Sequence, residues 1–372
     1  MDPNKLETQI QKTGFVLENE VAQILRKAGW SVISNKYYVD DYEGSVREID
    51  LIAYQVTKVQ HLDVYTVLII SCKKSESNTW ALLARKNNLK DPNYDWWPLH
   101  AWSNDKALAY QLMSQGFSQE YHTRAAALGV SEALAEPSVE VFAFQEMNQK
   151  TGAPQNDKPI FAAVTSLMKA QAYELGALPL RKKDPSIYQF NLLSVVDADL
   201  ARLMFTDQGI KCTEISSEHH LARYIIKKKD TFSRIRFIRA NTFRTALGDY
   251  GRLHKANQVL FAQACDAFYT DILGDLSRTN VFIEEFKRTL SWWLNWEIER
   301  KLSQQVEIKW YRFTLEKDRS KVHITIDLSQ SQIDLINSSE RCRQQTAKAL
   351  EGIYRYKGAF EFEFGYDDDI PF

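Results

Sequence analysis

A carboxylate and a lysine stand in two apolar segments of the chain that would otherwise read as ordinary core strands. Asp50 lies inside the apolar run 49–54, and Lys73 follows the apolar run 64–70. Burying such groups is costly unless they pair with each other or hold a metal ion. These positions are therefore candidates for chemistry. The alternative is a purely structural ion pair of Asp50 with Lys73 or Arg47.

A helix is predicted over residues 14–29, before these strands. Leu17 and Val21 belong to an apolar stripe at helical spacing, and Gly29 suits the position that ends a helix. Glu18 lies one turn before Val21, near this stripe rather than opposite it. Its carboxylate is therefore expected on the side of the helix that meets the rest of the domain.

The order of predicted elements favours an α/β fold. A strand at 30–39, a turn at 40–45 and a loop at 55–63 complete the opening region. No regular structure is assigned to 86–100, and about 86–135 reads as an insertion. The further elements are helices at 106–114, 120–129, 160–175, 256–276, 282–302 and 340–354, strands at 139–144, 188–196, 222–226, 234–238, 306–315 and 321–328, a loop at 147–158, and an alternating run at 360–364. We expect one domain over 1–250, a mostly helical α+β domain over 251–358, and a strand with an acidic tail over 359–372.

Composition narrows the class of protein. The 372 residues are 44% hydrophobic and 26% charged, which is typical of a globular protein. A net charge of −1 excludes an overall basic field for nucleic acid, so DNA binding would need a local patch. The 4 cysteines show no CxxC or zinc spacing. The first residues are polar and lack the apolar segment expected of a signal peptide, and no apolar run approaches the roughly 20 residues that span a bilayer. We expect a cytoplasmic protein with reduced thiols and no membrane association.

Taken together, Glu18, Asp50 and Lys73 resemble the active site of the PD-(D/E)XK nuclease superfamily, the restriction-endonuclease-like fold. The resemblance lies in the order of three segments: a helix with a glutamate, LENEVAQIL, then the strand REIDLIA, then the strand VLIISCKKS. Trp80 corresponds to a tryptophan that follows in several restriction-type members. The resemblance covers residues 13–85. It implies a core of a mixed sheet flanked by helices and a metal-dependent DNA endonuclease in restriction, phage defence or DNA repair.

The same resemblance implies roles for the site residues. Asp50 would be the main ligand of Mg²⁺ or Mn²⁺, with the backbone carbonyl of Cys72 as a second ligand and Glu18 reaching the ion through water. Lys73 would orient the attacking water and stabilise the charge that develops on the phosphate.

Ser71 departs from the family pattern, which has Asp or Glu at this position. A hydroxyl lacks the charge of a carboxylate, so metal affinity should fall. A subgroup of the family carries Ser-x-Lys and takes its acid from the next helix, but the corresponding position here is near Asn87, and Glu76 is the nearest downstream carboxylate. Ser71 would also fit a weak enzyme, an inactive site in a DNA-binding or adaptor protein, or an engineered substitution.

The last six residues resemble the C-terminal tip of bacterial single-stranded DNA-binding proteins. They are Asp367, Asp368, Asp369, Ile370, Pro371 and Phe372. The resemblance implies docking onto the proteins that bind that tip, with Phe372 in an apolar pocket and the aspartates facing a basic rim. A solubilising tail, an introduced segment and a tail that folds back on a basic patch of this chain are the competing explanations.

Basic residues are candidates for contacts with DNA. Arg234, Arg236, Arg239 and Arg244 interleave with apolar residues, so one face of a strand could be basic. The runs 181–183 and 227–229 are better explained as solvated faces. We expect three tryptophans of one helix, Trp292, Trp293 and Trp296, in the core rather than stacked on bases, and His219-His220 as a surface pair. Homo-oligomerisation is left open.

Overall fold

The computed structural model describes residues 3–40 and 44–365, and the chain divides into two compact units, Met1–Ala262 and Gln263–Phe372. The sequence predicted a boundary after residue 250. The helix α6 (Phe243–Tyr269) runs through that point, because Phe243, Leu247 and Tyr250 continue its buried stripe. Gly251, where the sequence suggested a change of character, lies inside this helix.

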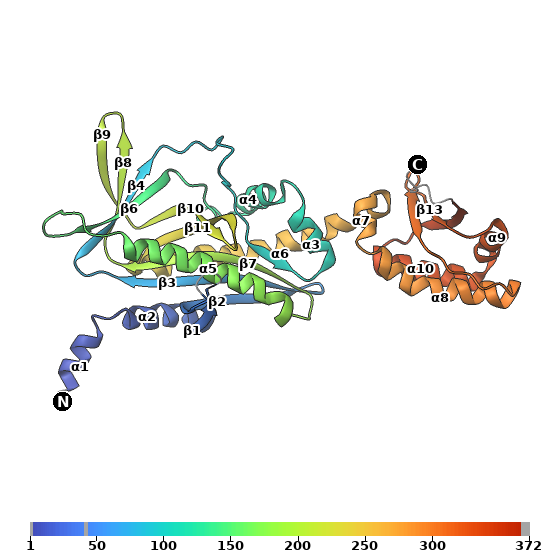
Figure 1. The fold of residues 1–372 in the computed structure, drawn as a ribbon, viewed down its shortest axis with the longest axis horizontal. Helices are drawn as coiled ribbons and strands as arrows, with labels where there is room; N and C mark the ends of the chain where they lie inside the picture. The colour runs from blue at the N-terminus through green and yellow to red at the C-terminus, as the bar shows by residue number, and fades with distance from the viewer. Residues whose placement is uncertain (1–2, 41–43, 366–372) are drawn as a thin grey trace. The chain divides into compact units, whose positions relative to one another are not determined.

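The first unit carries two mixed sheets with helices packed on them (Figure 1). Its further elements are α1 (Pro3–Ile10), α2 (Gly14–Lys27), β1 (Ser31–Val39), β2 (Val46–Val59), β3 (Leu62–Lys74), β4 (Asn78–Arg85), β5 (Ala101–Ser103), α3 (Lys106–Met113), α4 (Phe117–Ala127), β6 (Glu140–Asn148), α5 (Lys158–Arg181), β7 (Ser186–Asp197), β8 (Leu200–Thr206), β9 (Gly209–Ile215), β10 (Ser217–Ile226), β11 (Lys229–Arg239) and the short turn η1 (Ala240–Thr242). The predicted mixed α/β class is confirmed.

The larger sheet has the order β1-β2-β3-β7-β11-β10, with β5 added beside β7. β1, β2 and β3 form an antiparallel meander, while β7 lies parallel to β3 and β11 lies parallel to β7. Parallel neighbours require a crossover connection, and the chain between β3 and β7 includes α5. The predicted loop 55–63 is wrong, because β2 and β3 continue to a tight turn at Gln60, which has φ 56°.

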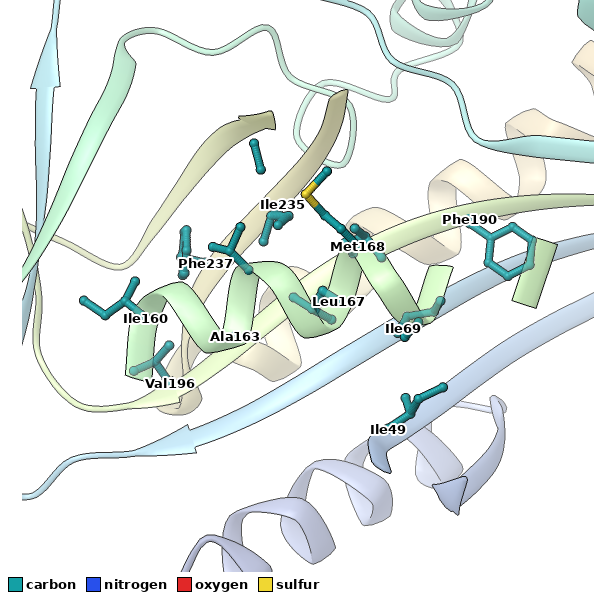
Figure 2. Packing of buried hydrophobic residues seen from close by; sticks show 14 of the residues in the cluster. Ile49, Ile69, Ile160, Ala163, Leu167, Met168, Phe190, Val196, Ile235 and Phe237 are labelled. Carbon is teal, nitrogen blue, oxygen red and sulfur yellow. The ribbon is translucent and has the colours of Figure 1, made fainter. Parts of the chain in front are cut away.

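α5 covers one face of this sheet and builds the core beneath it (Figure 2). Ile160, Ala163 and Leu167 recur at helical spacing along its buried side, and they pack with strand residues such as Ile69 and Phe237. The face that contacts α5 holds even-numbered residues of β2 and odd-numbered residues of β3. Asp50, Ser71 and Lys73 therefore share that face of the sheet.

The smaller sheet has the order β6-β4-β8-β9, and the sequence predicted only its strand β6. β9 was missed because its side chains are almost all exposed and give no apolar period. β4 was not predicted either, although Trp80, Ala81 and Leu82 in it are apolar and buried. The expected insertion therefore begins after a strand, and it contains β5, α3 and α4.

The second unit packs helices on a sheet with the order β12-β13-β14. Its elements are η2 (Ile272–Gly274), α7 (Leu276–Asn280), α8 (Ile283–Leu302), β12 (Tyr311–Leu315), β13 (Lys321–Ile326), α9 (Gln330–Ser338), α10 (Glu340–Tyr354) and β14 (Ala359–Phe364). Phe286, Phe313 and Tyr354 meet in its core. The sequence missed α9, and β12 is shorter than the strand predicted over 306–315. None of the helices in the described ranges has the length and apolar character to cross a membrane.

Candidate active site

The site lies where β2 and β3 part from each other. Their pairing ends at Leu51 and Ile70. Before that point β2 stays paired with β1 as far as Val46, and beyond it β3 stays paired with β7 as far as Lys74. The two strands thus form a fork, and backbone groups that face the opening lose their ladder partners. A polar side chain is needed to satisfy them.

The carboxylate of Asp50 fills this need. Its Oδ2 accepts hydrogen bonds from the backbone N–H of Cys72 at 2.7 Å and from the Ser71 hydroxyl at 3.2 Å. The ammonium of Lys73 lies 3.4 Å from the same oxygen. Asp50, Ser71 and Lys73, which the sequence singled out, are therefore brought together. The contact of Asp50 with Lys73 is also what a purely structural ion pair would show. It therefore does not by itself distinguish an active site from such an ion pair.

The backbone carbonyl of Cys72 faces the same opening. In a strand, the N–H and C=O of one residue point to the same side, since a hydrogen-bonded antiparallel pair exchanges both. Because the N–H of Cys72 points to the β2 side of β3, its carbonyl points to that side too. The side chain is buried, and this burial, together with the charges of Asp50 and Glu18, raises the pKa of the Cys72 thiol well above its ordinary value.

Glu18 is brought to the site by α2. Leu17, Val21 and Leu25 bury the apolar side of this helix, which confirms the predicted stripe. Partial burial raises the pKa of Glu18, the negative charge of Asp50 raises it further, and Lys73 opposes the effect. The carboxylate of Glu18 thus lies within the electrostatic field of the fork.

Glu48 is a residue of this site that sequence reasoning missed. It lies two positions before Asp50 on β2, hence on the same face, and it lines a small cavity together with Asp50, Ser71 and Ser166. Asn35 donates a hydrogen bond from Nδ2 to Glu48 Oε1 at 2.6 Å. The signal was available in the sequence as two acids spaced by two within a strand.

The donor set fits a hard divalent cation. No hydrogen bond reaches Oδ1 of Asp50 from the residues that the structure describes, so this oxygen and the Cys72 carbonyl can both serve as ligands. Mg²⁺ keeps several waters and needs only one or two carboxylates. Glu18, Glu48 and Asp50 do not converge, because their carboxylate oxygens do not all lie within 4.8 Å of one another. Glu18 and Glu48 are therefore placed to act through water.

Neither downstream position considered for the missing acid serves Asp50. Glu76 pairs with Lys74 at 3.3 Å, and the side-chain amide of Asn87 donates to the carbonyl of Pro137. Trp80 is buried in β4, and its Nε1 donates to Glu146 at 2.9 Å. Its hydrogen bond therefore supports the smaller sheet rather than the fork.

The predicted basic face on β11 is not formed. Arg236 is buried and donates to Asp249 at 2.8 Å and to Ser217 at 2.9 Å, so its guanidinium is not available to a phosphate. Arg234 donates to the main-chain carbonyls of Ala135 and Trp96. The arginines that alternate with apolar residues along β11 make polar contacts inside the protein. They do not form a face that is open to solvent.

Arg239 and Arg244 are the more accessible members of that group. Arg239 pairs with Asp199 at 2.6 Å and with Glu214, and it lines a polar cleft with Lys74 and Asp197 at the ends of β3, β7 and β11. Arg244 is exposed in the first turn of α6. These two positions remain candidates for DNA contacts.

Two further expectations are corrected. His219 and His220 are buried, at 8% and 9% exposure, and do not form a surface pair. The three tryptophans of α8 are not core residues: Trp292 is 60% exposed, and the guanidinium of Arg341 lies over Trp293 at 4.7 Å and over Trp296 at 4.3 Å. The spacing along α8 was helical, but Leu290, Leu294 and Ile298 occupy its buried side.

The tail residues Asp367, Asp368, Asp369, Ile370, Pro371 and Phe372 lie outside the described residues. Their docking role stays a prediction. Comparison of the whole chain with family models, with curated proteins and with solved structures finds no match.

Proposed function

We propose that this chain is a metal-dependent phosphodiesterase that cuts DNA, an endonuclease of the PD-(D/E)XK type. The observation that carries the proposal is the fork, where the Asp50 carboxylate, the Cys72 carbonyl and the Lys73 ammonium share one opening. The α2 helix, the three-stranded meander and the parallel strand β7 reached through α5 support it, because they give the mixed sheet flanked by helices that the resemblance implies.

Each side chain has a role in this proposal. Asp50 and the Cys72 carbonyl hold Mg²⁺ or Mn²⁺, which supplies an activated water and charge compensation on the phosphate. Lys73 positions the attacking water and stabilises the negative charge that develops on the phosphate oxygens. Glu18 has a raised pKa and lies within the electrostatic influence of Asp50 and Lys73, so it is suited to accept or return a proton through water.

A second candidate is a DNA-binding or adaptor protein that uses the same fold without catalysis. Ser71 favours it, because this hydroxyl donates to Asp50 where the family has a second acid. With Ser71, Lys73 and the Cys72 N–H all on Oδ2, the carboxylate of Asp50 is already compensated without a metal ion. The setting that the resemblances imply, in restriction, phage defence or repair, stays a prediction.

A cleavage assay separates the two candidates. Supercoiled plasmid and single-stranded circular DNA are incubated with the purified chain in Mg²⁺ or Mn²⁺, beside Asp50→Ala and Lys73→Ala. We expect nicking or linearisation by the parent and a loss of at least about 10²-fold in each variant, since each removes an electrostatic contact with the transition state.

The matched controls are Lys58→Ala, an exposed lysine of β2, and Glu20→Ala, an exposed acid of α2. Both should cleave like the parent. DNA binding without cleavage in either metal would support the adaptor instead. Cleavage that persists in Asp50→Ala and Lys73→Ala would exclude the fork as the active site.

A further inference from the structure

A surface of tryptophan and arginine side chains lies on α8 in the second unit. Trp292 is 60% exposed, and its ring meets that of Trp293 edge to face, with 4.6 Å between the ring centres. The guanidinium of Arg341, which α10 supplies, lies 4.7 Å from the ring centre of Trp293 and 4.3 Å from that of Trp296. The guanidinium of Arg300 lies 5.2 Å from the ring centre of Trp296. We call these five residues the tryptophan-arginine surface.

This surface faces away from the core of the unit. The apolar residues of α8 that pack into the core lie on the opposite side of the helix, which leaves the indole of Trp292 in solvent. One ridge of the helix carries four residues at intervals of four: Arg288, Trp292, Trp296 and Arg300. Two indoles are therefore flanked by a guanidinium at each end of the ridge, and the guanidinium of Arg341 lies beside them.

Arg341 is held in place because Glu297 fixes the start of α10 on α8. Glu297 is buried, and it accepts hydrogen bonds from Arg300 at 2.7 Å and from the Ser339 hydroxyl at 3.2 Å. Ser339 caps α10, and Arg341 follows in the first turn of that helix. A positive charge there opposes the helix dipole, so helix stability does not explain an arginine at this position.

Two guanidinium groups beside the indoles are open to a ligand. Neither Arg288 nor Arg341 forms an ion pair or a hydrogen bond through its guanidinium with the residues that the structure describes. The nearby acids Glu299 and Glu340 each accept a hydrogen bond from a glutamine side chain instead. The N–H donors of both arginines can therefore contact an anionic group.

We propose that the tryptophan-arginine surface binds single-stranded DNA. A base stacks on the exposed ring of Trp292, and Arg288 and Arg341 contact the phosphates on either side of it. Aromatic rings beside arginines suit this ligand, because every base has a face that stacks and the backbone is anionic. A duplex fits poorly, since its bases must first be unstacked from one another.

This ligand goes beyond the proposed nuclease activity. Stacking on Trp292 needs neither a metal ion nor Asp50, so the two proposals can fail separately. Only the choice of DNA over RNA rests on the proposed function.

Fluorescence anisotropy of the full chain tests the proposal in EDTA, which prevents metal-dependent cleavage. The probe is a labelled oligothymidylate of about 12 nucleotides, beside an abasic strand, a duplex and an oligouridylate of the same length. Trp292→Ala should bind the oligothymidylate about tenfold more weakly than the parent does, because the stacking of one base is lost. Its affinities for the abasic strand and the duplex should be unchanged.

Further variants sharpen the test. Trp292→Phe keeps a ring and should bind within about threefold of the parent. Arg341→Gln should lower the slope of log affinity against log salt by about 0.7, the value of one phosphate contact with a single strand. Phe161→Ala removes a 50% exposed ring from α5 of the first unit and is the matched control. It should bind like the parent, and so should Asp50→Ala.

Five outcomes would overturn the proposal. The first is unchanged affinity in Trp292→Ala, whose fold near-ultraviolet circular dichroism verifies. The second is equal binding of the oligothymidylate and the abasic strand by the parent, as expected for phosphate contacts alone. The third is no binding of any strand, as expected for a surface that meets another protein. The fourth is weaker binding in Asp50→Ala, which would place the strand at the fork. The fifth, tighter binding of the oligouridylate, would overturn the choice of DNA.

Discussion

The backbone N–H of Cys72 donates to Oδ2 of Asp50 over 2.7 Å, at the point where β2 and β3 separate. The carboxylate thus takes the place that a peptide carbonyl of β2 would hold in a continuous ladder. A side chain tied to the backbone in this way has few rotamers left. Asp50 is therefore pre-positioned, and the hydrogen bonds from Ser71, Cys72 and Lys73 all fall on its Oδ2.

Two substitutions of Asp50 separate its negative charge from its role as a hydrogen-bond acceptor. Asp50→Asn should keep an oxygen for the Cys72 N–H and unfold in urea within about 1 kcal/mol of the parent, whereas Asp50→Ala should lose about 1–3 kcal/mol because a buried donor is left unpaired. Both variants should fail to cleave DNA. Equal stability of the alanine and asparagine variants would contradict the role assigned to the Cys72 contact.

Ser71→Asp restores the acid that the family pattern has at this position. We expect it to bind Mn²⁺ at least about tenfold more tightly than the parent, since a carboxylate replaces a neutral hydroxyl beside the ion. Titration calorimetry measures the affinity, and the cleavage assay shows whether activity follows. Ser77→Asp, an exposed position just beyond β3, controls for added charge. An unchanged Mn²⁺ affinity in Ser71→Asp would argue against a metal at the fork.

Glu48→Gln tests the acid that the sequence analysis missed. If Glu48 holds a water on the metal ion, its loss should weaken Mn²⁺ binding about tenfold, as for other outer ligands, and leave the free energy of unfolding nearly unchanged because the side chain is exposed. Glu20→Gln is the matched control on a neighbouring element. Mn²⁺ binding equal to that of the parent would remove Glu48 from the site.

The raised pKa of Glu18 predicts a dependence of stability on pH. In the folded chain this carboxyl binds its proton more tightly than in the unfolded chain, so its ionisation opposes folding. Its contribution is fully present below the unfolded pKa and is lost as pH rises through the folded pKa. Glu18→Gln, which mimics the protonated form, should therefore be more stable than the parent at pH 8 and similar to it at pH 4, in urea unfolding at both values. A Glu18→Gln variant less stable than the parent at pH 8 would contradict this account.

Replacing Arg236 should lower the stability of the fold, whereas replacing Arg244 should leave stability nearly unchanged and test DNA binding. Arg236→Ala leaves Asp249 buried with Arg252 as its one ion-pair partner among the described residues, and it should lower the free energy of unfolding by about 3 kcal/mol. Arg244→Ala, at an exposed site, should change it by no more than about 0.5 kcal/mol. If either arginine contacts DNA, it is Arg244, whose replacement should weaken binding in a salt-dependent way. An Arg236→Ala variant that is as stable as the parent but binds DNA more weakly would support the basic face that the sequence predicted on β11.

The sequence alone determined the local parts of this protein. Periodicity identified α2 and its buried stripe, the apolar strands around Asp50 and Lys73, and the mixed α/β class, because these patterns depend on neighbours a few residues away. It also indicated that Asp50 and Lys73 needed a compensating partner. Elements without an apolar period, such as β9, gave no signal.

Only the tertiary structure decided what depends on distant segments. β7 pairs with β3 after a long crossover, and this pairing continues to Lys74, beyond the point where β2 and β3 separate at Asp50. An arginine that alternates with apolar residues looks the same in sequence whether it meets solvent or a buried carboxylate. Arg236 is buried because Asp249, on the following helix, pairs with it, and a buried charge is stable only beside its counter-charge.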